Sequence, residues 1–232
     1  MLRKLEAEGK ITLPAPLKRS RSTGSADKIV WHMHDTTPVE TALHDLLPLQ
    51  VNIVTAKNDV TVFKSYIDQY HYLGFERSIG ESMKYDISSR DGVPLASLMF
   101  GASAWACHPR DSFIGWESSQ RQASLRFISN NSRFLIYPWV KSPCLASHIL
   151  GLISRRVSDD WQAKYSHPLF MLETFVECSR FKAVSYRAAN WVCVGKTAGR
   201  GRNDRMNAWA LPEKYVYLLP LTRRWRETLQ SI

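Results

Sequence analysis

The chain has 232 residues, of which 44% are hydrophobic and 11% aromatic, enough to bury one large core and to exclude disordered and fibrous proteins. Its longest uncharged apolar stretches, such as residues 93–106, are interrupted by Pro, Gly and Ser and fall short of the roughly 18–20 residues that cross a bilayer. Residues 1–10 carry charges where a signal peptide would be apolar, so we expect a cytoplasmic protein with no membrane partner. The four cysteines form no C-x-x-C pair, which disfavours a zinc or redox site and fits a reducing compartment.

The positive charge is concentrated at the two ends of the sequence. The net charge is +10; residues 1–30 hold seven Lys/Arg against three acids, residues 195–232 eight against three, and the middle sixteen against fifteen. Clustered basic residues are typical of proteins that bind polyanions, although a solvated surface is the alternative. We therefore predict binding to nucleic acid, with DNA as the expected form, through residues that include Arg200, Arg202 and Arg205.

The N-terminal region predicts an extension outside the folded domain. Residues 2–8 have the composition of a helix end, closed by Gly9 and followed by a short apolar run, as where a winged helix leaves its recognition helix. Residues 14–28 are rich in Pro, Ser, Gly and basic residues, which is typical of a linker. We predict a basic extension and linker over residues 1–28 and a folded domain over residues 29–232.

The first half of the domain alternates between strand and helix patterns. Residues 50–55 predict a strand, and Asn58 or Asp59 can cap a helix that ends before Gly74. That helix has a single apolar stripe made of Val62, Phe63, Tyr66, Ile67 and Tyr70. Residues 82–89 and 93–104 flank the turn Arg90-Asp91-Gly92 and predict a β-hairpin.

The second half completes an α+β pattern. A polar helix over 118–127 is followed by a strand over 133–140 and an amphipathic helix from Leu145. The remaining predicted elements are a strand over 168–176, a short helix over 183–190, and strands over 191–196 and 214–219. This order predicts a mixed sheet flanked by helices, with the segments 133–140 and 168–176 side by side and separating near Ser142.

Several short motifs in this order resemble a known family. The strand, small-residue turn, central helix, strand and Tyr-Arg-Ala-Ala-Asn-Trp helix resemble the GNAT (N-acetyltransferase-like) fold. More specifically, the chain resembles the A-component family of the Druantia anti-phage defence system, in which members often carry a longer winged-helix-like N-terminus; residues 1–13 look like its remnant. The matching blocks are 71–74, 110–111 with 114–116, 130–135 with 138–140, 145–148, 172–176, 186–191 and 199–202.

The GNAT resemblance implies a phosphate-holding turn before the central helix, here Ser142 to Ser147. In that fold backbone N–H groups at the helix N-terminus bind the cofactor pyrophosphate. The stretch lacks the family's glycines and Pro143 removes a donor, which argues against acyl-CoA binding by the ordinary route. A helix cap by Ser142 or Ser147 explains these residues equally well, so the cofactor stays unknown.

Two residues of the matched blocks are candidates for catalysis. Glu173 lies in an apolar strand, where a carboxylate needs a partner, and Arg133 or Arg187 can supply it. Tyr186 matches the tyrosine that protonates a leaving group in GNAT enzymes, or it fills the core with its hydroxyl bonded. We predict a pocket where Glu173, Tyr186, Asn130 and Arg133 converge. Arg133, Arg187, Asn130 and Asn131 are also candidate nucleic-acid contacts.

The spacing of the remaining candidate catalytic and metal-binding residues gives weaker support for a function. Asp111 and Arg110 follow Pro109 in an expected loop, and His71 can act as a general base or complement a helix dipole. A metal-dependent nuclease could use Asp111, Glu173 and Glu177, since hard oxygens bind Mg²⁺. His32-Met33-His34 has the letters of a nuclease metal motif, three letters that arise easily by chance.

The sequence is compatible with two classes of function. The first is a nucleic-acid-binding component of an anti-phage defence or mobile-element system, with other defence proteins as partners. The second is an enzyme that acts on nucleic acid, either an acyltransferase or a metal-dependent nuclease. A further resemblance of residues 132–134 and 186–191 to Mom-type DNA base-modifying proteins makes a nucleic-acid-directed acyltransferase conceivable. The missing phosphate-loop glycines favour the first class, and the polar blocks around Glu173 favour the second.

Overall fold

The computed structural model describes residue 9 and residues 29–197 and 212–231. The chain divides into a unit of residues 1–30 and a unit of residues 31–232, and the fold is that of the second unit. The predicted extension over residues 1–28, apart from Gly9, and the three arginines Arg200, Arg202 and Arg205 lie outside the described residues. The extension and its basic role therefore stay predictions.

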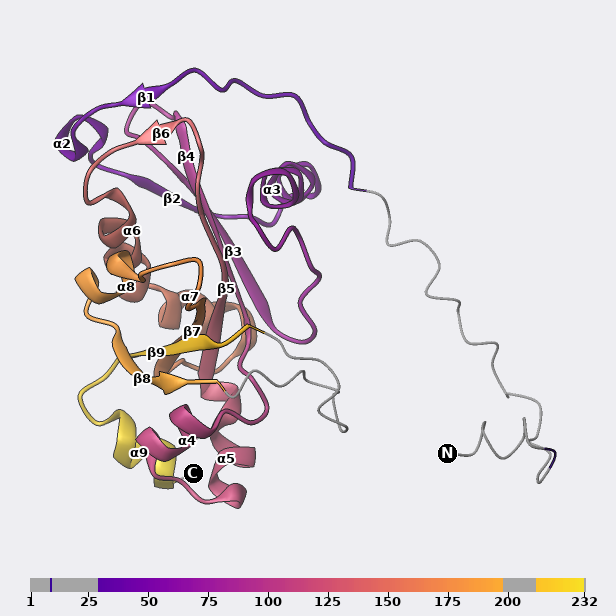
Figure 1. The fold of residues 1–232 in the computed structure, drawn as a ribbon, viewed down its shortest axis with the longest axis vertical. Helices are drawn as coiled ribbons and strands as arrows, with labels where there is room; N and C mark the ends of the chain where they lie inside the picture. Colours follow the sequence, from indigo (N-terminus) through magenta and orange to yellow (C-terminus); the bar gives the residue numbers. More distant parts are fainter. Residues whose placement is uncertain (1–8, 10–28, 198–211, 232) are drawn as a thin grey trace. The chain divides into compact units, whose positions relative to one another are not determined.

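A seven-stranded mixed sheet forms the centre of the domain (Figure 1). Its strands lie in the order β2-β3-β4-β5-β7-β9-β8. All neighbours are antiparallel except β5 and β7, which are parallel. Their bounds are β2 Gln50–Ile53, β3 Ser82–Ser88, β4 Pro94–Ala102, β5 Ile128–Ile136, β7 Met171–Glu177, β8 Val192–Lys196 and β9 Lys214–Pro220. A separate parallel pair joins β1 (Val39–Glu40) to β6 (Val140–Lys141).

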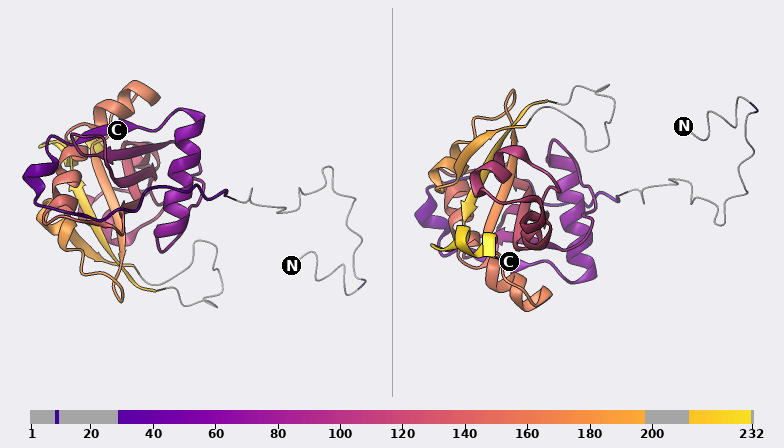
Figure 2. Two further views of the ribbon diagram at one scale, coloured as in Figure 1. Left: turned by 90° about the horizontal axis from the view of Figure 1, so that it is seen from above. Right: turned by 90° about the horizontal axis from the view of Figure 1, so that it is seen from below.

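Helices cover both faces of this sheet, as Figures 1 and 2 show. Helix α3 (Lys57–Tyr70) lies on one face, and α6 (Leu145–Ser154), α7 (Val157–Tyr165) and α8 (Val184–Ala188) lie on the other. At one end of the sheet α4 (His108–Ile114) contacts β8 and β9, and α5 (Ser118–Ser124) contacts α9 (Trp225–Ser231). The short elements are α2 (Leu43–Leu46) and the 3-10 turn η1 (Leu125–Phe127). None of the helices within the described ranges is long and apolar enough to cross a membrane.

The central strands owe their burial to apolar side chains on both sides. In β4 every residue from Leu95 to Gly101 is buried, the pattern of a strand covered on both faces. A large core joins this strand to α3 and α6, and a smaller one includes Ile114, Phe127 and Leu229 beneath α4, α5 and α9. This sheet and its two cores hold the segments around β5 and β7 in place.

Strands β5 and β7 pair over three residues only and then separate. The paired positions are Ile128 to Asn130 with Met171 to Glu173. At the next position the side chain of Thr174 donates a hydrogen bond to the Asn131 carbonyl oxygen at 2.9 Å. That bond replaces the backbone ladder, so the strands open apart from this point.

A β-bulge in β5 lies at the same point. The register with β4 shifts between Met99 and Phe100, which leaves Ser132 as the additional residue. The side-chain amide of Asn131 donates to the carbonyl oxygens of Met99 (3.2 Å) and Arg133 (3.0 Å). The bulge is therefore stabilised by the side chain that precedes it.

Most predicted elements are confirmed, but several details are wrong. Helix α3 begins at Lys57, so neither Asn58 nor Asp59 caps it. The mixed α+β sheet, the hairpin and the parallel neighbours β5 and β7 are present. However, β5 begins at Ile128 and not at Arg133, because the polar residues 129–132 did not fit a strand pattern. The strands also separate after Asn130, well before Ser142. Arg110 and Asp111 lie in helix α4, because Pro109 occupies its first turn, where a missing N–H costs nothing.

Candidate functional site

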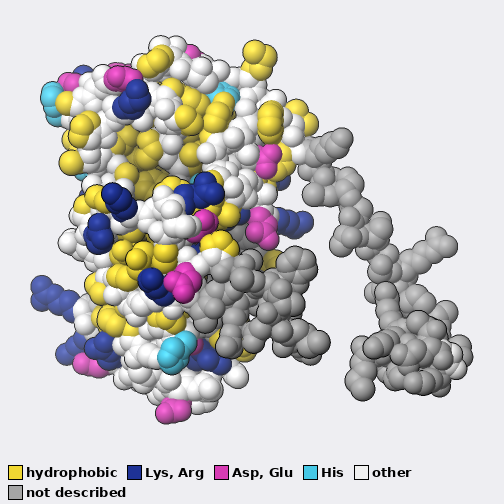
Figure 3. All heavy atoms as spheres, in the orientation of Figure 1, with side chains coloured by type: hydrophobic (Ala, Val, Ile, Leu, Met, Phe, Trp, Pro, Cys, Tyr) yellow, Lys and Arg dark blue, Asp and Glu magenta, His cyan; other side chains and the backbone are white. Residues whose placement is uncertain are grey.

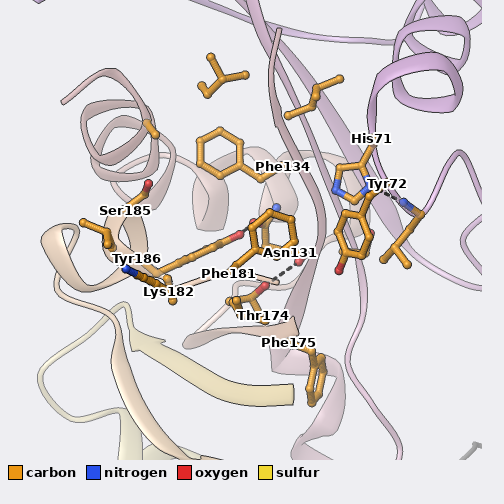
Figure 4. Close-up of a pocket in the computed structure, with 18 of the residues that line it drawn as sticks. His71, Tyr72, Asn131, Phe134, Thr174, Phe175, Phe181, Lys182, Ser185 and Tyr186 are labelled. Carbon is orange, nitrogen blue, oxygen red and sulfur yellow. Dashed lines mark hydrogen bonds between the residues drawn. The ribbon is translucent and has the colours of Figure 1, made fainter. Parts of the chain in front are cut away.

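A cleft of about 540 Å³ occupies the gap between the diverging strands β5 and β7. Figure 4 shows its lining from three directions: His71 and Tyr72 after α3, Asn131 and Phe134 on β5, and Phe181 to Tyr186 before and in α8. Ala146 in the first turn of α6 also lines it. Figure 3 shows hydrophobic side chains in a hollow in the upper half of the molecule, with Lys and Arg side chains below it. The cleft thus offers an apolar volume with a few polar groups, the usual form of a ligand site.

Two aromatic side chains connect the rims of the cleft. Tyr72 and Phe181 are 37% and 42% exposed, and their rings meet edge to face at 5.1 Å between centroids. The Arg180 guanidinium lies over the Tyr72 ring at 4.9 Å. Since these residues belong to two separate connections, their contact bridges the cleft opening.

The floor of the cleft is polar at the point where the strands separate. The Tyr186 hydroxyl donates to Asn131 Oδ1 at 2.7 Å, and its ring packs against Trp191 and Tyr217. Burial raises the pKa of Tyr186 well above its ordinary value. The hydroxyl therefore keeps its proton at neutral pH, held at a fixed place beside Asn131.

The turn before α6 has free hydrogen-bonding groups despite its missing glycines. The amides of Ala146 and Ser147 have no backbone acceptor in the described part of the chain, and the buried Ser142 Oγ has no partner there. The Ser147 hydroxyl is engaged, since it donates to the Cys144 carbonyl oxygen at 3.0 Å. Cys144 takes a left-handed conformation (φ 64°) at the helix N-terminus, a conformation more typical of glycine.

His71 lies at the cleft as a neutral ring. Its Nδ1 accepts a hydrogen bond from the Leu73 amide at 3.2 Å, so in the neutral ring the proton is on Nε2. Burial, followed by the charge of Arg133, lowers the pKa of His71 to about 4. A protonated imidazole at the end of α3 is therefore not expected at neutral pH, and the engaged Nδ1 does not favour the general-base role.

Glu173 pairs with Arg110, which makes the predicted partners Arg133 and Arg187 wrong. The carboxylate is fully buried; Oε2 accepts from Arg110 Nη1 at 2.9 Å and Oε1 from the Ala104 amide at 2.7 Å. Burial raises the pKa of Glu173, and Arg110 and the Ala104 amide oppose that rise. Glu173 does not line the cleft. The sequence could not identify this pair, because it depends on where α4 packs.

Asp111 completes the same buried network. Its Oδ1 lies 2.8 Å from Arg110 Nη2 and accepts from the Trp116 indole N–H at 3.1 Å, while Oδ2 accepts from the Cys107 amide. Asp111 and Glu173 thus share a guanidinium where the nuclease hypothesis placed a metal ion. Glu177 lies four residues further along β7, about 13 Å away at 3.3 Å per residue. The described residues contain no group of three His, Cys, Asp or Glu side chains suited to a metal.

The remaining predicted residues do not converge on one pocket. Arg133 Nε donates to the Gly74 carbonyl oxygen at 2.8 Å and Nη1 to that of Ser132, so this arginine fastens the connection after α3 to β5. Neither Arg133 nor Asn130 lines the cleft, and Asn130 Oδ1 is buried without a partner among the described residues. Arg187 is exposed on α8. Of the four residues predicted to meet, Tyr186 alone lines the cleft.

The His32-Met33-His34 motif also has a different place. His34 Nδ1 lies 2.9 Å from the His32 carbonyl oxygen, and Nε2 lies 2.9 Å from the Tyr70 hydroxyl. The ring packs among Tyr66, Tyr70 and Trp139. Both nitrogens are thus bonded within the protein, and His34 belongs to an aromatic cluster.

The sequence pattern missed several residues that shape the cleft. Tyr72 and Phe181 lie in irregular connections, where no hydrophobic periodicity distinguishes them from their neighbours. Thr174 has a high strand propensity and lies in an apolar strand, so its polar role was not apparent. The doubled Asn130-Asn131 was a usable signal, since polar residues inside a strand indicate a bulge or a site. Asn131 bonds Tyr186 and the bulge, and its role as a nucleic-acid contact stays a prediction.

Comparisons with known proteins give one family and several solved structures of low sequence identity. Spermidine N-acetyltransferase from Vibrio cholerae, solved with CoA and spermine, aligns at a TM-score of 0.48 with 9% identity over 75% of this chain and 95% of that one. FeeM, an N-acyl amino acid synthase from uncultured soil microbes, aligns at 0.45 with 12% identity over 77% and 93%. No curated protein matches the sequence. The family model described as Druantia protein DruA matches residues 4–217, so the chain belongs to the Druantia protein DruA family.

Proposed function

We propose that this member of an anti-phage defence family binds an acyl donor of the acyl-CoA type in the β5–β7 cleft. The observation that carries the proposal is the Tyr186 hydroxyl, which lies at the cleft floor where the strands separate and retains its proton. Other components of the defence system are its proposed partners. Family membership supports the setting, and the cleft supports the ligand class.

The residues around the cleft fit such a donor. The free amides of Ala146 and Ser147 lie at a helix N-terminus, where phosphate oxygens are bound favourably. Lys182 lines the cleft without an ion-pair partner among the described residues. Phe134, Phe181 and Ala146 supply apolar contacts for an acyl chain or a pantetheine-like arm.

The chemistry assigned to the chain is proton transfer at one atom. A bound acyl thioester would supply an activated carbonyl and a sulfur leaving group. If a nucleophilic acceptor forms a bond to that carbonyl carbon, the C–S bond breaks and Tyr186 Oη can give its proton to the departing sulfur. The proton that the acceptor loses passes to solvent, and solvent returns one to Tyr186. Asn131 Oδ1 keeps the hydroxyl oriented before the transfer. A positioned general acid of this kind contributes typically 10²- to 10⁴-fold to a rate.

Tyr186→Phe tests the role of that hydroxyl. We expect the variant to bind acetyl-CoA within about threefold of wild type in isothermal titration, since the ring and cleft remain, and to lose protection in a phage plating assay. Tyr165→Phe is the matched control, because the Tyr165 hydroxyl donates to the Ser82 carbonyl oxygen at 2.7 Å outside the cleft. Full protection by Tyr186→Phe, or absence of acetyl-CoA binding by wild type, contradicts the proposal.

A second candidate, nucleic-acid binding, is favoured by the charge distribution. Residues 1–28 and 198–211 hold ten Lys/Arg against four Asp/Glu, so they carry +6 of the net +10. We propose that these segments contact the phosphates of DNA or RNA with little sequence preference. Each neutralised phosphate of duplex DNA adds about 0.9 to the slope of log K against log salt. Arg200, Arg202 and Arg205 changed together to Ala should flatten that slope by up to about 2.7; an unchanged slope counts against these arginines.

A further inference from the structure

A second groove, of about 600 Å³, lies beside the cleft and shares one residue with it. Its walls are the connection from Glu76 to Glu81, the segment from Gly101 to Trp105, and the side chains of Gln122 and Arg126. Ser132, the bulged residue of β5, lines both the groove and the cleft. The bulge therefore borders both hollows.

The exposed side chains of this groove are aromatic, apolar and cationic. Trp105 is 59% exposed and Ile79 is 78% exposed. Arg77 and Arg126 are exposed and have no ion-pair partner within the described ranges; Arg126 lies over the Phe127 ring at 4.7 Å, which orients its guanidinium. An exposed indole within a hollow offers a flat apolar face to a ligand.

The groove also holds two carboxylates, of which Glu81 is bonded within the protein and Glu76 is 85% exposed. Glu81 lies 2.9 Å from His167 Nε2 and accepts from the Trp161 indole N–H at 3.3 Å. Glu76 faces Arg133 at 3.8 Å. The groove is lined by Arg77, Arg126 and Arg133 against Glu76 and Glu81, a net charge of +1. The excess positive charge favours a negatively charged ligand.

Small residues of β4 and the segment after it form part of the groove lining. Gly101 and Ala102 belong to it, and a Cβ atom built on Gly101 would lie 3.1 Å from the Ser78 hydroxyl oxygen. The connection after α3 therefore approaches β4 closely at this glycine.

We propose that this groove binds single-stranded nucleic acid, with one unpaired base stacked on Trp105 and flanking phosphates held by Arg77 and Arg126. Stacking platforms beside cations are the way in which proteins hold single strands, because every base has a flat face. The inference rests on the nucleic-acid partner proposed above and names the form and the surface. It does not depend on the acyl donor.

The test compares a fluorescently labelled oligo-dT with an abasic oligomer of the same length and charge, by anisotropy with the full chain. Stacking predicts that wild type binds the oligo-dT about 5- to 100-fold more tightly than the abasic strand, and that Trp105→Ala removes this preference. Arg77→Ala and Arg126→Ala should weaken both strands. Trp31→Ala and Arg155→Ala are matched controls, since both residues are exposed and do not line the groove.

The outcomes separate this inference from the broader proposal. Equal binding of both strands by wild type, or an unchanged preference in Trp105→Ala, overturns the groove while leaving nucleic-acid binding by the basic segments intact. Tighter binding of duplex than of single strand also overturns it. Circular dichroism of Trp105→Ala checks the fold, and Trp105→Phe, which keeps an aromatic face, should restore part of the preference.

Discussion

At the scale of single residues, Arg110 joins two carboxylates that lie far apart in the sequence. Glu173 and Asp111 both bind its guanidinium, and neither Arg110 nor Glu173 is exposed. Removing one member of a buried pair costs roughly 3–5 kcal/mol. We expect Glu173→Gln to lower the free energy of unfolding by about 3 kcal/mol, at the lower end because Asp111 still pairs with Arg110.

Urea denaturation of Glu173→Gln measures this cost, with Glu227→Gln as the control. Glu227 is largely exposed beside Arg224 at 4.0 Å, and its loss should change stability by less than about 0.5 kcal/mol. A Glu173→Gln variant with the wild-type midpoint would show that the network is not structural. Loss of defence without loss of stability would instead return Glu173 to a functional role.

Two buried titratable groups give opposite pH dependences. The pKa of His71 is lowered to about 4 by burial, so its contribution to stability is lost as pH falls from about 6.5 to about 4. The pKa of Asp86 is raised to about 6 by burial, although Ser97 donates to it at 2.6 Å, so its contribution is lost as pH rises from about 4 to about 6.

Single substitutions should separate these two effects. As pH rises from 4 to 6, the free energy of unfolding of Asp86→Asn should increase relative to that of wild type. Over the same rise in pH, the free energy of unfolding of His71→Gln should decrease relative to that of wild type. Urea midpoints of the three proteins at pH 4.5 and pH 6.5 test both signs. Differences that do not vary with pH would contradict the burial of these two groups.

At the scale of elements, the bulge of β5 and its separation from β7 create the cleft. Asn131→Leu leaves the carbonyl oxygens of Met99 and Arg133 without their side-chain donor and should cost roughly 2–4 kcal/mol. Thr174→Val removes one bond at nearly constant shape and should cost about 1 kcal/mol. Ser132→Ala, which loses a longer bond of 3.3 Å, is the control on the same strand. Denaturation midpoints that reverse this order would contradict the account of the bulge.

The same elements show what the sequence could predict. The hairpin of β3 and β4 and the helix α6 have regular apolar patterns, so their positions were predictable. Helix α4 has seven residues with two charges in its centre, too short for a periodic signal. The pair of Arg110 with Glu173 spans 63 positions and depends on how α4 packs against the sheet, which no local pattern encodes.

At the scale of the whole molecule, the fold combines a cleft and a groove, and the residues that the structure describes carry a small net charge. The described residues hold 21 Lys/Arg against 17 Asp/Glu, a net +4, so most of the basic excess lies in residues 1–28 and 198–211. The family resemblance was predictable from the ordered blocks, and the family match confirms it. The rim of the cleft was not predictable from the sequence, because Tyr72 and Phe181 meet only in the folded chain.

The central claim is that the first turn of α6 and the cleft together hold an acyl donor. Amide hydrogen exchange of Ala146 and Ser147, followed by NMR with and without coenzyme A, tests it most directly. Both amides lack an acceptor in the described structure and should exchange rapidly in the free protein. The account predicts that saturating coenzyme A slows their exchange at least about tenfold, as bound phosphate oxygens accept both N–H groups. Unchanged exchange at both amides under saturating ligand would contradict it.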